Sequence, residues 1–165
     1  RSILTIYEGT TAIQANDLVG RKTARDGGQL AKAVAAQIEQ TEAELQASGT
    51  ADAQAVARRL AAARQAFLDA VDFMAANTKA NPNAAFAGSV PYLMLAGNLV
   101  AGWQMGRALL VAQQLSSKGQ DQAFMQAKIA TARFYAEHIL VKAPAQRDAI
   151  VEGAASVTAL ALDAF

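Results

Sequence analysis

The sequence predicts an all-α protein folded as an up-and-down helical bundle, and three observations indicate this class. Alanine supplies 41 of the 165 residues, and it has the highest helix propensity because it loses no side-chain entropy in a helix. Apolar residues recur at steps of three and four over long stretches, as on the buried face of a helix. Short segments containing Gly, Pro or Asn separate these stretches. A chain of this length is sufficient for one domain with its own core.

The first expected helix follows a short loop. Residues 1–7 are mostly apolar, and the hydroxyl of Thr10 or Thr11 can cap the helix that begins there. The apolar side of this helix carries Ile13, Leu18 and Val19. Cations occur near its C-terminal end, where the helix dipole favours them, at Arg21, Lys22 and Arg25. The pair Gly27-Gly28 then predicts a break in the chain.

Two long amphipathic helices are expected next. The first covers about residues 29–47, and the steps between its apolar-face residues are four, four, three and four, at Leu30, Val34, Ile38, Thr41 and Leu45. Residues 48–50 separate it from a second helix that continues to about Thr78. One face of the second helix carries Val56, Leu60, Ala63, Phe67, Val71 and Met74. Both patterns predict a buried face and a mostly solvated back.

The most apolar stretch follows the turn signal Asn81-Pro82-Asn83, because proline presets its φ and asparagine bonds to nearby backbone. Ser89 is the expected N-cap, Pro91 lies in the first turn, and the helix is expected over about residues 90–115. The run from residue 80 to 106 carries no charge. A helix that is apolar on all sides is normally buried, so we expect a bundle core or subunit contact rather than a membrane span.

Two further helices complete the expected bundle. The spacing predicts one over about residues 121–141, with Met125, Ile129, Ala132, Ala136 and Ile139 on one face. Lys142-Ala143-Pro144 then turns the chain into a last helix over about residues 145–164. Four long helices and one shorter terminal helix, joined by brief loops, are typical of an up-and-down bundle.

The charge balance and the rare residue types exclude several classes of function. Fifteen Lys and Arg against fourteen Asp and Glu give no one-sided field for nucleic acid or an anionic membrane. The absence of cysteine removes disulfides and thiolate ligands, and a reducing cytoplasm suits this composition. No metal site is expected, and His138 is interpreted as a packed or dipole-compensating residue. Arg58, Arg59 and Arg64 favour a solvated helix face over a phosphate-binding patch.

One carboxylate near the start could carry chemistry. Glu8 follows an apolar, aromatic segment and precedes a glycine, which lets another molecule approach the backbone closely. Removal from water would raise its pKa and make it a better base for a weak carbon acid. A single Glu near a helix start more commonly just interacts with the helix dipole. On the residues alone both interpretations stay open, and the second is favoured.

The segment around Glu8 resembles the C-terminal signature of the acyl-CoA dehydrogenase family. The matching residues are Ile6-Tyr7-Glu8-Gly9-Thr10-Thr11-Ala12-Ile13-Gln14. The continuation Asp17-Leu18-Val19-Gly20-Arg21-Lys22 looks like the branch of that family in which an extra helical domain follows the dehydrogenase core. The resemblance therefore implies that residues 1–27 end a dehydrogenase core and that residues 28–165 form an appended helical bundle.

The resemblance also implies an activity, cofactor and partners. A member of this family oxidises an acyl-CoA to the trans-2-enoyl-CoA, and Glu8 matches its catalytic base. Tyr7 and Gly9 match substrate-binding positions, whereas Thr10, Thr11 and Ala12 match a segment that contacts FAD. The acceptor would be an electron-transfer flavoprotein or a similar protein, and the enzyme would be a cytoplasmic homo-oligomer.

The chain begins inside the matching motif, so we expect a fragment that lacks the acyl-CoA cleft and most of the flavin site. Such a fragment alone should be inactive. The bundle is expected to be architectural, packing on the core and burying subunit surface around residues 90–115. The alternative is a non-catalytic helical scaffold or oligomerisation module in which the match to the signature is accidental.

Overall fold

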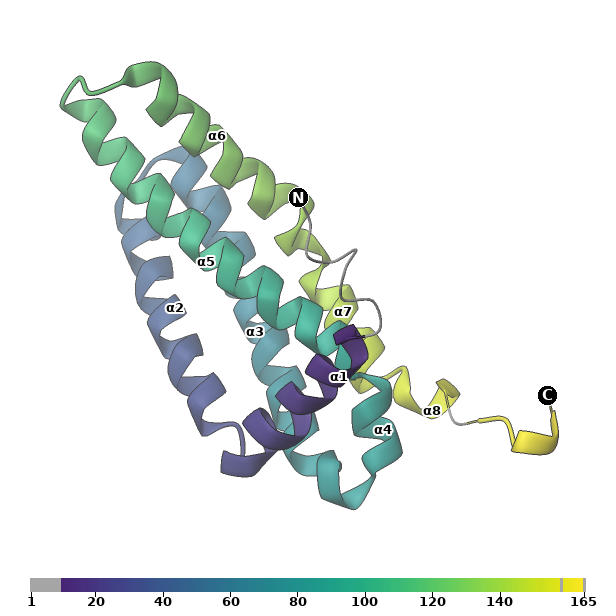
Figure 1. Ribbon diagram of the computed structural model, residues 1–165. Coiled ribbons are helices and arrows are strands. Elements are labelled where there is room, and N and C mark those ends of the chain that lie inside the picture. The colour runs from purple at the N-terminus through teal and green to yellow at the C-terminus, as the bar shows by residue number, and fades with distance from the viewer. Residues whose placement is uncertain (1–9, 158, 165) are drawn as a thin grey trace.

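The computed structural model describes residues 10–157 and 159–164, and every regular element in these ranges is helical. The predicted all-α class is therefore confirmed. The helices are α1 (Thr10–Asp17), α2 (Gln29–Ala47), α3 (Ala51–Ala80), α4 (Pro82–Ala87), α5 (Ser89–Ser117), α6 (Gln122–His138), α7 (Ala143–Val151) and α8 (Ala154–Val157). Figure 1 shows α2, α3, α5 and α6 as an antiparallel bundle with short connections.

Four shorter helical segments connect or end these elements. A π-helix, η2 (Leu18–Thr23), continues α1 without a break and leads into the 3₁₀ turn η3 (Ala24–Asp26). The 3₁₀ turn η4 (Leu140–Lys142) joins α6 to α7, and η5 (Leu162–Ala164) lies near the end of the chain.

The hairpin of α2 and α3 agrees with the sequence pattern. Helix α2 covers residues 29–47 as expected, and α3 extends two residues past the predicted Thr78. Between them Gly49 has a φ of +70°. The Thr50 hydroxyl accepts a hydrogen bond from the Ala53 N–H at 3.3 Å, so it caps α3.

The chain between α3 and α5 differs from the prediction. The expected turn at Asn81 also starts the short helix α4, because the Asn81 side chain accepts a hydrogen bond from the Ala84 N–H and Pro82 is the first helical residue. Gly88, rather than Ser89, then occupies the N-cap position of α5. Ser89 is buried in the first turn of that helix, so the predicted Ser89 cap was wrong.

The predicted C-terminal helix was also wrong in extent. Helix α7 begins at Ala143, and the helical path is interrupted at Glu152 and Gly153 before the single turn of α8. Glycine lowers helix stability by about 1 kcal/mol relative to alanine. The side chains beyond this point also find little cover, since Val157 is 68% exposed. Without an apolar partner, a short helix has little to stabilise it.

The core lies where the stripes of the long helices meet. Its largest fully buried side chains are Tyr92, Ile38, Leu45, Leu60, Met74, Leu95, Leu99, Leu109, Leu140 and Ile150. The predicted stripes are confirmed at most positions. Leu30, in the first turn of α2, is an exception and is 68% exposed. Ile13 is likewise 66% exposed, on the outer face of α1.

Polar side chains also join the helices. Arg64 of α3 donates two hydrogen bonds to the buried Glu42 carboxylate of α2, at 2.9 and 3.0 Å. The paired carboxylate raises the pKa of Arg64. Trp103 of α5 donates its indole N–H to the Thr41 hydroxyl at 2.8 Å, so α2 is bonded to both of its neighbours.

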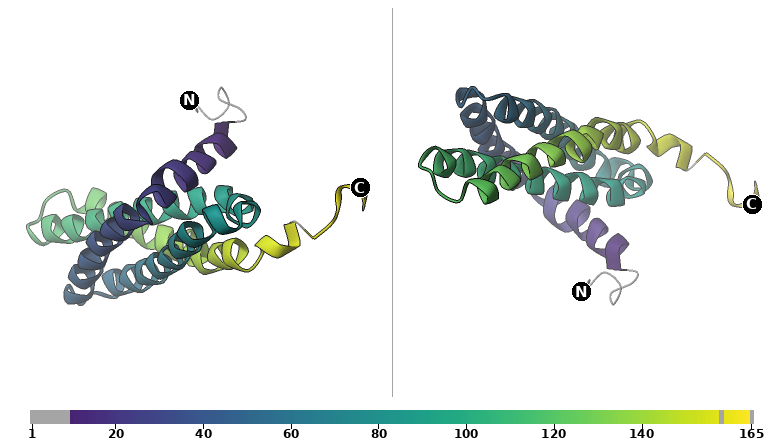
Figure 2. Two further views of the ribbon diagram at one scale, coloured as in Figure 1. Left: turned by 90° about the horizontal axis from the view of Figure 1, so that it is seen from below. Right: turned by 90° about the horizontal axis from the view of Figure 1, so that it is seen from above.

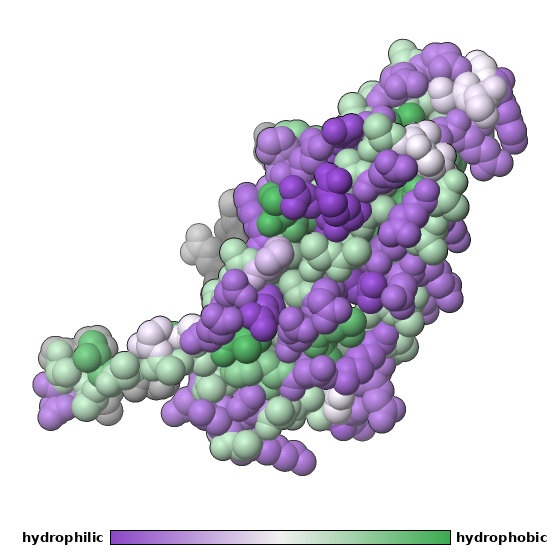
Figure 3. All heavy atoms as spheres, turned by 180° about the vertical axis from the view of Figure 1, so that it is seen from behind, coloured by the Kyte–Doolittle hydropathy of each residue, from purple (hydrophilic) through white to green (hydrophobic). Residues whose placement is uncertain are grey.

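Apolar and polar residues share the outer surface. Figure 3 shows the rear face mostly covered by hydrophilic residues, with smaller apolar patches between them. Among the described residues no helix has the length and hydropathy needed to cross a membrane. Eight residues of α5 are buried and the helix packs against α3 and α6, so the expectation that it is a bundle helix is confirmed.

Candidate functional site

The residues expected to carry the chemistry lie at the start of the chain. Glu8, Tyr7 and Gly9 are outside the described residues, so their predicted roles remain predictions. Thr10, Thr11 and Ala12 form the first turn of α1. Thr10 is partly buried, whereas Thr11 and Ala12 are exposed. Because the helix already includes Thr11, that residue is not the N-cap.

Helix α1 is attached to the bundle on one side only. Ala15 is fully buried where α1 packs against α5, and Val19 is fully buried in the following turn. Thr11, Ala12, Ile13 and Gln14 are all exposed. Figure 2 shows α1 leaving the bundle at an angle, with its N-terminal end away from the other helices. The first turn of α1 is therefore presented outward while the opposite end is embedded.

The embedded end is the π-helix η2, whose buried residues are Val19 and Thr23. The hydroxyl of Thr23 is 2.8 Å from the hydroxyl of Tyr92 on α5, and this hydrogen bond is buried. The Tyr92 ring stacks on Phe67 of α3, with the ring centroids 5.8 Å apart and the planes at 5°. Removal of the phenol from water raises the pKa of Tyr92 to about 12.

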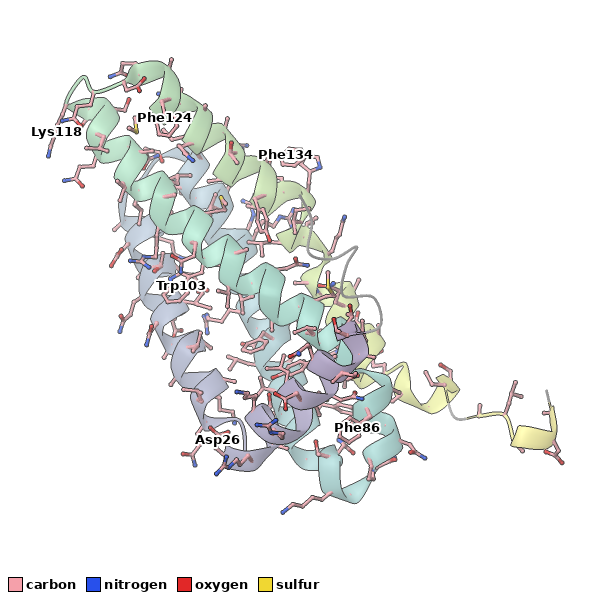
Figure 4. The ribbon with its side chains drawn as sticks, in the orientation of Figure 1. Asp26, Phe86, Trp103, Lys118, Phe124 and Phe134 are labelled. Carbon is pink, nitrogen blue, oxygen red and sulfur yellow. The ribbon has the colours of Figure 1, made fainter. Side chains whose placement is uncertain are left out.

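The turn from η3 into α2 is also tightly bonded. Asp26 accepts hydrogen bonds from the backbone N–H groups of Gly28 and Leu30, each at 2.9 Å. Gly28 is the N-cap residue of α2 and Leu30 lies in its first turn, where a negative charge is favoured. Figure 4 shows Asp26 at the turn into α2 and Phe86 on α4, both near the embedded end of the N-terminal helix.

An apolar groove of about 170 Å³ lies beside this end. Its lining residues come from η2, α2, α3 and α5, and they are Leu18, Lys22, Thr23, Leu30, Ala31, Val34, Phe67, Tyr92 and Ala96. The groove has one charged lining residue, Lys22. The volume of this groove is below that of ordinary small-molecule sites, so the groove itself is not a substrate-sized pocket.

No metal centre is present in the described residues, because no three His, Cys, Asp or Glu side chains come together there. His138 stacks on Phe134 at 4.4 Å between ring centroids and is exposed at the end of α6. It agrees with the predicted dipole-compensating role but not with a packed one. Figure 4 shows Phe134 directed outward from α6.

The three arginines on α3 do not share one solvated face. Arg58 is exposed, but the Arg64 side chain is only 16% exposed and pairs with Glu42 and Glu39. Arg64 is therefore an interhelical residue rather than part of a basic surface. The spacing of the apolar residues predicted a solvent-exposed position for Arg64. It did not indicate that Glu42 on α2 would be its partner.

Sequence reasoning missed Thr23 and Tyr92. Both are polar residues in positions that carry no recognisable motif, and neither belongs to the predicted apolar stripes. The signal that could have identified Tyr92 is its place three residues after Ser89 inside an uncharged helix, where a hydroxyl requires a buried partner. The identity of that partner depends on the tertiary fold.

Comparison with known proteins identifies the family. The model of the family described as "Acetyl-CoA dehydrogenase C-terminal like" matches residues 30–161. The chain is 53% identical to 3-methylmercaptopropionyl-CoA dehydrogenase of Ruegeria pomeroyi over 91% of its own length and 25% of that relative. It is 32% identical to the broad-specificity linear acyl-CoA dehydrogenase FadE5 of Mycobacterium tuberculosis, over 88% of its own length and 25% of that relative.

The chain spans about a quarter of the length of these curated relatives. Both relatives are named as acyl-CoA dehydrogenases, in agreement with the resemblance of residues 6–14. The helical bundle of α2 to α7 lies within the matched range except for its first residue, Gln29. The chain therefore belongs to the family described as "Acetyl-CoA dehydrogenase C-terminal like".

Proposed function

We propose that this chain is the C-terminal part of a flavin-dependent acyl-CoA dehydrogenase that oxidises an acyl-CoA to the trans-2-enoyl-CoA. The observation that carries the proposal is the junction of two features in one chain. The nine-residue signature at residues 6–14 leads directly into a bundle that the family model matches from residue 30 onward. An accidental match to the signature would not be expected next to this bundle.

In the proposed reaction Glu8 is the general base and removes the α-proton of the thioester. Bound FAD would accept the hydrogen that leaves the β-carbon as hydride, so that both electrons leave the substrate. An α-proton beside a thioester is only weakly acidic, so the base must be positioned and kept from water. Tyr7 and Gly9 would line the substrate side, next to Glu8 in the chain.

The start of α1 suits contact with a flavin that other parts of the enzyme hold. Thr11 and Ala12 are exposed in the first turn, and Thr10 is partly exposed. The N–H groups at a helix N-terminus favour negative or electron-rich groups. We therefore assign Thr10, Thr11 and Ala12 to FAD contact, the last through its backbone, while most of the flavin site lies outside this chain.

The bundle would have an architectural role. Helix α5 keeps several large apolar side chains partly exposed, at Val90 (38%), Met94 (48%), Val100 (43%) and Val111 (53%). Exposed apolar residues in such number favour contact with another protein surface. We propose that α5 packs against the dehydrogenase core or a second subunit, with residues 1–27 ending the core and residues 28–165 forming the extension.

The remaining partners follow from the same proposal. The substrate would be an acyl-CoA, and reduced flavin would pass its electrons to an electron-transfer flavoprotein or a similar acceptor. We expect a homo-oligomer in the cytoplasm. The competing function is a non-catalytic scaffold, for which the apolar exposure of α5 alone would be sufficient.

Substitution of Glu8 in the complete polypeptide tests the proposed base. We expect Glu8→Gln to retain the yellow flavin spectrum and to slow exchange of the substrate α-proton by about 10²- to 10⁴-fold. Glu44→Gln is the matched control, because Glu44 is an exposed carboxylate on α2, and it should leave exchange unchanged. Full exchange in Glu8→Gln would remove Glu8 from the mechanism, and a complete polypeptide that binds no flavin would favour the scaffold.

A further inference from the structure

We infer that Tyr92, a bundle residue, is a positioning residue for the base-bearing segment, acting through its hydrogen bond to Thr23. The inference rests on the proposed function, because it assumes that Glu8 before α1 is the base. It assigns to the bundle a second role besides packing: fixing the direction in which α1 leaves its surface. Tyr92 itself would not touch substrate or flavin.

The contacts of Tyr92 join three separate parts of the fold. The residue belongs to α5, its ring stacks on Phe67 of α3, and its hydroxyl is 2.8 Å from that of Thr23 in η2. Tyr92 is 1% exposed and Thr23 is 4% exposed. The backbone carbonyl of Thr23 also accepts a hydrogen bond from the Gly28 N–H at 2.8 Å. Thr23 is therefore held from both its side chain and its backbone.

The geometry of α1 makes this attachment important. Thr10 and Thr23 are the ends of a continuous helical path, and its length is about 20 Å at about 1.5 Å per residue. The outer half is exposed on most sides, so its direction is set mainly at the embedded end (Figure 2). A rotation of about 5° at Thr23 would move the first turn by about 2 Å, and a misplacement of about 1 Å can slow a reaction about 10²-fold.

Packing alone would fix this direction less well. The other fully buried residues of the path are Ala15 and Val19. Apolar burial is non-directional, so it tolerates small rotations, whereas a hydrogen bond weakens as its angle departs from linearity. The π-helix also changes the angular order of side chains along the path. Thr23 of η2 faces Tyr92 in this arrangement, and their bond supplies a directional restraint.

Three variants of the complete polypeptide separate positioning from stability. Tyr92→Phe and Thr23→Val each leave one buried hydroxyl without its partner, whereas the double variant replaces both members of the pair by apolar groups. A buried polar group without its partner destabilises a protein, but removal of both partners can be nearly neutral. We expect kcat to fall about tenfold in all three variants with KM and flavin content unchanged. The resistance to urea should recover in the double variant while kcat does not.

Tyr135→Phe is the matched control. The Tyr135 hydroxyl donates a hydrogen bond to the Asn98 carbonyl at 3.3 Å, so this bond joins α6 to α5 rather than to the N-terminal helix. This variant also loses one tyrosine hydroxyl, and it should leave kcat unchanged. Unchanged kcat in Tyr92→Phe, or kcat that recovers together with stability in the double variant, would overturn the inference.

The failure of this inference is distinguishable from failure of the proposed function. Full α-proton exchange in Glu8→Gln would refute the base assignment, whatever the behaviour of the Tyr92 variants. Loss of exchange in Glu8→Gln together with an unchanged rate in Tyr92→Phe would refute only the positioning role.

Discussion

Substitution of Gly28 by alanine tests how tightly the N-terminal segment is joined to the bundle. Gly28 is buried and has a φ of +82°, a conformation that costs a residue with a Cβ about 1 kcal/mol or more. An added Cβ would also lie 2.5 Å from Cγ1 of Val71 on α3. Gly28→Ala therefore adds a steric conflict to the backbone strain.

The neighbouring glycine separates the two contributions. Gly27 has a φ of +67°, but an added Cβ there would meet no atom within 4 Å. Gly27→Ala should lower the free energy of unfolding by about 1 kcal/mol, from backbone strain alone. Gly28→Ala should lower it by about 2–4 kcal/mol, because overpacking a core contact adds about 1–3 kcal/mol.

Urea unfolding of the three single variants and one double variant measures these values. Val71→Ala removes the methyl groups that the new Cβ would meet, at a cost of its own. The double variant Gly28→Ala/Val71→Ala should therefore lose less free energy of unfolding than the sum of the losses in the two single variants, by at least about 1 kcal/mol. Equal losses for Gly27→Ala and Gly28→Ala, or strict additivity with Val71→Ala, would refute the close packing of Gly28 against α3.

Three further predictions concern polar side chains that join the elements of the fold. Glu42→Gln should lower the free energy of unfolding by about 3 kcal/mol, because the paired Arg64 is largely buried; Glu39→Gln, which alters a 62% exposed carboxylate, should change it by less than about 1 kcal/mol in the same urea titration. The stability that the neutral Tyr92 phenol contributes should be complete below pH 10 and lost towards pH 12, because the unfolded chain releases that proton near 10.0 and the folded chain near 12. The loss amounts to about 2–3 kcal/mol. In Tyr92→Phe the free energy of unfolding should not show this decrease between about pH 10 and pH 12. Asp26→Ala should cost about 1 kcal/mol, measured by thermal unfolding, because the Leu30 N–H at the start of α2 loses its acceptor and the Gly28 N–H keeps only the Thr23 carbonyl; an unchanged midpoint would contradict the capping role.

The long helices were predictable because their signals are local. The bounds of α2 follow from a continuous apolar stripe, a glycine pair before it and polar residues after it. The prediction of the C-terminal helix failed because its extent depends on tertiary packing rather than on a local signal. Residues such as Val157 have helical spacing, but Val157 is 68% exposed, so tertiary packing stabilises a helix there only weakly. Periodicity describes a face that could be buried, and the fold decides whether anything covers it.

In the candidate site, too, some residues could be predicted from a local pattern, whereas others depend on the tertiary fold. The nine-residue signature is a local pattern, so Glu8 and its neighbours could be selected from the sequence alone. The hydrogen bond between Thr23 and Tyr92 joins residues 69 positions apart, and no local pattern specifies such a pair. The Glu42 and Arg64 pair was missed similarly, because each residue taken alone fits an exposed helix face.

The buried contacts also bear on where the bundle begins. A boundary near residue 27 follows the glycine pair and the start of the family match at residue 30. The packing crosses that boundary, since Val19 and Thr23 are buried among the bundle helices and Asp26 caps α2. A polar pair that is satisfied only when both sides are present makes each side depend on the other. Residues 18–26 therefore belong to the bundle energetically, and under the positioning role that we infer for Tyr92 the contacts that stabilise the bundle would also set the direction of α1.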